Sequence, residues 1–96
     1  MNAYFEMFRD IANKIIYKKY RVSEYILSDC IYYEFWGKSF FNLEIRLYED
    51  YYDIQIRNHY NSKKFVIVSA EYDDINDFKR CIKNSLKIWQ LFNNML

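Results

Sequence analysis

Side chains that could carry catalysis are few in this sequence of 96 residues. Nucleophilic catalysis needs a base beside a serine, cysteine or threonine, and the chain has one histidine, His59, and no threonine. His59 falls in a predicted hairpin loop, where a lone histidine is typical of a solvent-facing polar residue. Gly37 is the single glycine, which excludes a glycine-rich phosphate loop. We therefore expect that the protein is not an enzyme and uses no cofactor.

The sequence also contains few residues that could bind a metal ion or form a disulfide. Cys30 and Cys81 lie far apart in predicted regular elements, and no short spacing joins cysteine and histidine as in a zinc site. We expect no metal and two buried thiols in a reducing compartment. No signal-peptide core and no long apolar run occurs in the sequence, so we expect a cytoplasmic protein (in the host cell if phage-encoded) without a membrane span.

Carboxylates do cluster in the sequence, at Glu49-Asp50, at Glu71 and at Asp73-Asp74. These positions are predicted turns and a helix start, where acidic residues serve as turn formers and helix caps. The formal net charge is +1, so the chain as a whole has no strong field for nucleic acid. The elements that position these charges therefore decide what they can do.

Strands are predicted through the middle of the chain. Apolar and polar residues alternate over 41–47 and again over 52–57, as in strands with one buried face. The run 65–68 is continuously apolar and predicts a more fully buried strand, central or covered. A weaker alternation over 30–36 adds a fourth strand, joined to the next by a turn at 37–39. Residues 21–29 are predicted to be irregular or a short helix.

Two helices flank the strands. Apolar residues at steps of three and four predict an amphipathic helix from Asn2 to about Tyr20 and a second after Asp73 or Asp74. We expect a single α+β domain over 1–96: a two-layer sandwich of helix, antiparallel meander of three to four strands, and helix, with both helices on one sheet face. The predicted core contains Phe8, Ile15, Leu43, Ile45, Ile54, Ile56, Ile67, Phe78, Ile82 and Trp89.

Alternate turns of a meander lie at opposite ends of its sheet. The turn at 49–51 and the exit from the last strand at 71–74 therefore share one end, while 37–38 and 59–64 share the other. This predicts an acidic, tyrosine-bearing surface for a basic protein partner. Its members are Glu49, Asp50, Tyr51, Tyr52, Asp53, Glu71, Tyr72, Asp73, Asp74 and Asp77. The alternative is that these acids only cap a helix and form turns.

A nucleic-acid-binding module is the second hypothesis for function. Two surfaces could serve it: the basic end of the first helix and the polar face of the sheet, where Tyr32 and Trp36 could stack on bases. The cations concerned are Lys14, Lys18, Lys19, Arg21, Arg46 and Arg57. On the sheet face, the alternative is cross-strand pairing of Arg46 and Arg57 with Glu44 or Asp53. A homodimer and a monomer both remain open.

The acidic segments Glu49–Asp53 and Glu71–Asp77, in a chain of this size and element order, resemble small phage-encoded inhibitors of the anti-CRISPR type. The resemblance implies an inhibitor whose acidic loops imitate nucleic acid and occupy a basic groove of a protein partner such as a CRISPR effector. The element order is also similar to the double-stranded-RNA-binding domain. That family has lysines at the start of its last helix, where this chain has Asp73, Asp74 and Asp77.

Overall fold

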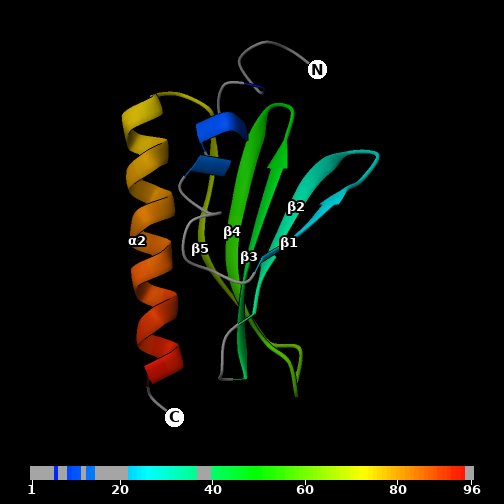
Figure 1. Cartoon of the computed structure of the whole chain (residues 1–96), viewed down its shortest axis with the longest axis vertical. Coiled ribbons are helices and arrows are strands. Elements are labelled where there is room, and N and C mark those ends of the chain that lie inside the picture. The colour runs from blue at the N-terminus through cyan, green and yellow to red at the C-terminus, as the bar shows by residue number, and fades with distance from the viewer. Residues whose placement is uncertain (1–5, 7–8, 12, 15–21, 37–39, 95–96) are drawn as a thin grey trace.

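The computed structural model describes residues 6, 9–11, 13–14, 22–36 and 40–94. Five strands form one antiparallel sheet in the order of the chain, and a long helix follows them (Figure 1). The elements are β1 (Val22–Ile26), β2 (Cys30–Phe35), β3 (Phe41–Tyr48), β4 (Tyr51–Asn58), β5 (Lys64–Glu71) and α2 (Ile75–Asn94). Residues 6, 9–11 and 13–14 are helical as well. The predicted α+β sandwich is confirmed.

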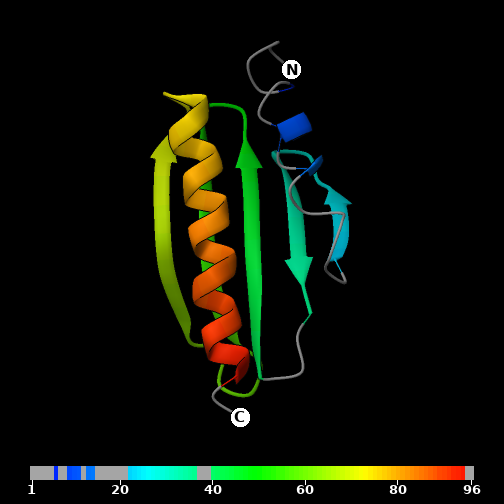
Figure 2. The same ribbon diagram turned by 60° about the vertical axis from the view of Figure 1, so that its left-hand side comes forward.

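Both helical segments lie on one face of the sheet. Helix α2 packs across β3 and β4 (Figure 2). The helical residues before β1 reach the same face, because Ile11 packs against the core and Asn13 accepts a hydrogen bond of 2.8 Å from the Tyr33 hydroxyl. The opposite face of the sheet, called the open face below, carries no helix in the described part of the chain.

The core lies between α2 and the helix-covered face of the sheet. Its buried members come from β2, β3, β4 and α2, and Trp89 also donates an indole hydrogen bond of 2.9 Å to the carbonyl of Phe41. Of the predicted core, the residues found buried are Leu43, Ile45, Ile54, Ile56, Phe78, Ile82 and Trp89. Ile67 is partly buried against them. Phe8 and Ile15 fall outside the described residues.

Helix α2 begins where its capping signal predicts. The Asp74 carboxylate accepts hydrogen bonds from the backbone N–H groups of Asn76 (2.7 Å) and Asp77 (3.2 Å), and its carbonyl accepts one from Phe78. These contacts satisfy donors that a helix start leaves open. In the described residues, no helix combines the length and the apolar character needed to cross a membrane.

Residues 21–29 correct one prediction. Val22–Ile26 form strand β1, which pairs antiparallel with β2 so that Tyr25 lies opposite Tyr32. The meander therefore has five strands instead of three or four. The segment is short and alternates weakly by itself, and β1 becomes regular because β2 offers it a row of backbone hydrogen-bonding groups.

Strand β5 corrects a second prediction. The run 65–68 was predicted to be buried, yet β5 is an edge strand in which Phe65 is 50% and Val66 is 64% exposed. Helix α2 covers β3 and β4, so it leaves β5 at the rim. The pairing of β4 with β5 also shifts by one residue between Ile54 and Gln55, which makes Ile67 an extra residue in β5 and sends Val66 to the open face.

Candidate functional site

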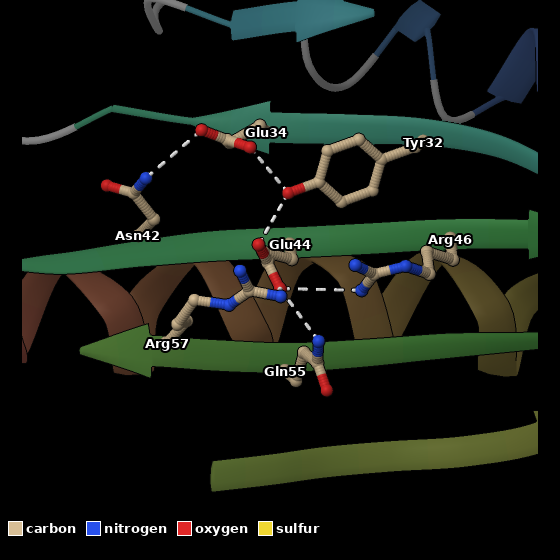
Figure 3. A network of polar contacts seen from close by, with 7 residues as sticks. All are labelled: Tyr32, Glu34, Asn42, Glu44, Arg46, Gln55 and Arg57. Carbon is tan, nitrogen blue, oxygen red and sulfur yellow. Dashed lines mark hydrogen bonds and ion pairs between the residues drawn. The ribbon is translucent and has the colours of Figure 1, made fainter. Parts of the chain in front are cut away.

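The open face carries a buried carboxylate at its centre. Glu44 on β3 is only 1% exposed, although it lies on the face without a helix. Its Oε1 accepts a hydrogen bond of 2.7 Å from the side-chain amide of Gln55, and its Oε2 lies 2.5 Å from the Tyr32 hydroxyl (Figure 3). The side chains of the neighbouring strands therefore exclude water from Glu44.

Two arginines complete the surroundings of Glu44. Arg57 and Arg46 bring guanidinium nitrogens to 3.3 Å and 3.4 Å from Glu44 Oε1, and the Arg46 guanidinium also lies over the Tyr32 ring, 4.4 Å from its centroid. Burial alone raises the pKa of Glu44, but the hydrogen bonds from Tyr32 and Gln55 and the two arginines outweigh it, so the pKa is lowered. Glu44 is therefore a charged group inside a neutralising network.

The Tyr32 hydroxyl links Glu44 to a second carboxylate. Its oxygen lies 2.5 Å from Glu34 Oε2 as well as 2.5 Å from Glu44 Oε2. One hydroxyl has one proton, so it donates to one of the two carboxylates at a time. Burial, followed by hydrogen bonding to these carboxylates, raises the pKa of Tyr32. The hydroxyl is thus a hydrogen-bond donor within a closed network, and no catalytic role follows from it.

The network extends to the single histidine. Asn42 donates to Glu34 Oε1 at 3.3 Å, and Asn42 Oδ1 lies 2.6 Å from Nε2 of His59. The His59 ring stacks on Trp36 with centroids 5.2 Å apart. His59 is therefore held by an amide and an indole, with neither a serine nor a cysteine among these contacts.

These contacts bear on the two hypotheses made for the sheet face. Cross-strand pairing occurs, because Arg57 of β4 faces the Glu44 carboxylate of β3, while Arg46 pairs with Glu44 from the same strand. On the same face, Arg46 lies over the Tyr32 ring and Trp36 stacks on His59, and nucleic-acid binding by this face stays a prediction. We call the group formed by Tyr32, Glu34, Asn42, Glu44, Arg46, Gln55 and Arg57 the Glu44 network.

A second group of carboxylates lies in three connections at one end of the sheet. The turns after β1 and β3 and the connection from β5 to α2 all lie at one end of the sheet, at the top of Figure 1. Every acidic residue of these connections, and Asp77 in the first turn of α2, is exposed. We call this group the acidic end; its members are Asp29, Glu49, Asp50, Glu71, Asp73, Asp74 and Asp77.

A groove opens at the acidic end between β5 and the start of α2. It encloses about 650 Å³, and its lining includes Tyr52, Val68, Ala70 and Cys81 on the apolar side. Its charged rim consists of Glu71, Asp73, Asp74, Asp77 and Arg80. The lining thus combines an apolar floor with carboxylates, and Arg80 forms an ion pair with Asp77.

The tyrosines predicted for this surface divide into three environments. Tyr51 is exposed and stacks on Tyr48 at a centroid distance of 4.4 Å. Tyr72 is half-buried, and its hydroxyl donates a hydrogen bond of 2.6 Å to the Tyr48 carbonyl. Tyr52 is buried against Phe78 and reaches the surface only as part of the groove lining. Tyr51 is therefore the tyrosine best placed for a partner.

The predicted surface needs two corrections. Asp53 lies on the open face opposite Arg46, because residues 51, 53 and 55 of β4 alternate with the buried ones. Asp29 was not predicted, since only the strand β1 brings its turn to this end. It lies near Cys30, where burial and then the Asp29 carboxylate raise the pKa of the thiol.

The basic residues are distributed elsewhere. Lys63 and Lys64 are exposed at the β4–β5 end of the sheet, opposite the acidic end, and Lys14 is exposed in the first helical segment. Lys18, Lys19 and Arg21, predicted to contact nucleic acid, lie outside the described residues, as does Lys38.

Within the described residues, no group of three or more histidine, cysteine or acidic side chains is arranged to hold a metal ion, and Cys30 and Cys81 are free thiols. No protein-family model, curated protein or solved structure matches the chain.

Proposed function

We propose that this chain is a small, non-enzymatic binding protein of the cytoplasm that docks its acidic end onto a basic surface of a protein partner. The observation that carries the proposal is the gathering of seven exposed carboxylates at one end of the sheet, four of which line one groove. The partner surface would be a groove that normally accepts nucleic acid, so that docking inhibits the partner. A CRISPR effector, the partner that the resemblance implies, has such a groove.

Helix capping explains only part of the acidic end. Asp74 caps α2 and Asp77 pairs with Arg80, so these two carboxylates have structural roles. Glu49 and Asp50 belong to a strand-to-strand turn and cap no helix. Carboxylates that remain exposed beside an exposed tyrosine are typical of a surface that steers a basic partner.

Direct binding of nucleic acid is the weaker alternative. On the open face, Arg46 and Arg57 already interact with Glu44, so phosphate contacts would have to break a buried network. The acidic end itself repels phosphate. A gel-shift titration of the purified chain with duplex DNA and RNA separates the two functions, because a salt-sensitive shift would favour the alternative.

The decisive experiment reverses charge in the β3–β4 turn. The double variant Glu49→Lys/Asp50→Lys and the wild-type chain are used as baits in the cells that naturally make the protein. The proteins that each bait retains are quantified. We expect the variant to lose a basic partner by about tenfold or more, and raised salt to weaken the wild-type complex, because long-range attraction dominates the association rate. Added nucleic acid should compete with the wild-type bait.

The control is Lys63→Glu/Lys87→Glu, a reversal of equal size at exposed positions away from the acidic end. It should retain the partner. Equal losses from both double variants, or no loss from the acidic one, would contradict the proposal and leave the carboxylates as caps and turn residues.

A further inference from the structure

The helix-covered face of the sheet is covered unevenly. Helix α2 packs on β3 and β4. The helical residues before β1 lie on the same face, toward the β1 edge of the sheet, where Arg9 pairs with Glu24 of β1. Beyond α2, on the side of β5, no described element covers the sheet. Phe65 of β5 remains 50% exposed, although it touches Phe92 of α2, and Ile88 of α2 is also exposed.

The outer edge of β5 is open as well. β5 is the last strand of the sheet and is eight residues long, whereas β1 at the other edge has five. Among the described residues, no strand pairs with that outer edge. A long edge strand with exposed apolar side chains is a template for a further strand, and the question is which strand fits it.

The extra residue Ile67 gives β5 an unusual symmetry. Antiparallel partners share a face, so Lys64 and Glu71 lie on the open face with their partners Arg57 and Tyr51. Phe65 and Ala70 lie on the helix-covered face with their partners Ile56 and Tyr52. Residues at equal distances from the middle of β5 therefore lie on the same face, which a regular strand of eight residues would not allow because its faces alternate.

This symmetry makes β5 complementary to itself. Two β5 strands can run antiparallel in the register that aligns their middles. Residue 64 of one strand then faces residue 71 of the other, and residue 65 faces residue 70. Lys64 then meets a glutamate, and the half-exposed ring of Phe65 covers the small side chain of Ala70. Both matches occur twice about a twofold axis, as in an isologous dimer.

We propose that a second copy of this chain occupies the β5 edge, so that two five-stranded sheets join through antiparallel β5 strands into one continuous sheet. The two α2 helices lie on the same side of that sheet, and their β5-facing flanks, with Ile88 and Phe92, border the junction. The acidic ends of the two copies point in opposite directions, so Glu49 and Asp50 remain accessible in each. The dimer pairs Glu71 of each acidic end with a lysine of the other copy but leaves the β3–β4 turn accessible, so it does not rest on the function proposed above.

The test is a charge swap followed in the ultracentrifuge. The wild-type chain should sediment as a dimer of twice 12.0 kDa and dissociate on dilution over about a hundredfold range of concentration. Lys64→Glu and Glu71→Lys each place like charges opposite one another at two positions, so each alone should weaken the dimer by about tenfold. Both positions are exposed, and circular dichroism checks that each variant is folded.

Two further samples keep the test specific to the junction. Lys64→Glu mixed with Glu71→Lys restores opposite charges at both positions and should give a heterodimer, as should the double variant with itself. Lys87→Glu, an exposed change on α2, should dimerise like the wild type. A wild-type chain that stays monomeric, or single variants that associate as well as the wild type, or a mixture that does not recover, would overturn the proposal.

Discussion

Glu44 and the residues of the acidic end all carry a carboxylate, but Glu44 is buried and the acidic end is exposed. Glu44 lies in the middle of a strand, is almost fully buried, and is met by an amide, a hydroxyl and two guanidinium groups. Glu49 and Asp50 lie in a turn and are exposed. A buried charge must be neutralised locally, whereas an exposed one is free to act at a distance. The first region therefore stabilises the fold, and the second is available for a partner.

The largest expected effect comes from removing the apolar support beneath the acidic end. Phe78 is buried and packs edge-on against Tyr52 and Tyr72, the rings beside the groove. Phe78→Ala should lower the free energy of unfolding by about 3–5 kcal/mol, because it leaves a cavity, as measured by urea denaturation. The matched control is Leu91→Ala on the exposed side of α2, which should cost about 0.5 kcal/mol or less. An unchanged midpoint for Phe78→Ala would mean that α2 is packed in another register.

Removing the charge of Glu44 should have a smaller effect on the free energy of unfolding, and that effect should depend on pH. Glu44→Gln keeps the shape but removes the charge that faces Arg46 and Arg57, so we expect a loss of about 1.5–3 kcal/mol at neutral pH. The pKa of Glu44 is lowered in the folded protein, so its contribution is present above the ordinary glutamate pKa and disappears as the pH falls through the lowered value.

Urea unfolding of the wild type and of Glu44→Gln from neutral to acidic pH measures this contribution. The difference in stability between the two proteins should shrink steadily below the ordinary glutamate pKa of 4.5. If the difference stays constant across that pH range, the charge of Glu44 is not what the network stabilises.

The acidic end should give the smallest effects on stability. Asp74→Ala removes the cap of α2 and should cost about 1 kcal/mol. The reversal Glu49→Lys/Asp50→Lys should stay within about 0.5 kcal/mol of the wild type, because neither residue is buried. Thermal unfolding of both variants checks this order. A loss from the reversal as large as that from Glu44→Gln would show that the two regions do not differ in the way described.

Local patterns were sufficient for much of the fold. Alternation over 41–47 and 52–57 predicts β3 and β4, and the apolar stripe with Asp74 at its start predicts α2. The order of turns also predicts that residues 49–50 and 71–74 share one end. These features depend on side-chain spacing within an element and on the up-and-down path of a meander, and both can be read from residues adjacent in the chain.

The tertiary structure decided which surfaces are covered. Alternation marks Glu44 as polar-facing, but its burial depends on Tyr32 and Arg57 of the two neighbouring strands. Phe65 and Val66 read as buried residues, but α2 lies over β3 and β4, and the extra residue Ile67 turns Val66 outward. Coverage and strand pairing depend on residues that are distant in sequence. The spacing of residues therefore predicts β2 to β5 and α2 in their order, whereas β1, the neutralised charges and the exposed edge of β5 depend on packing between residues that are distant in sequence.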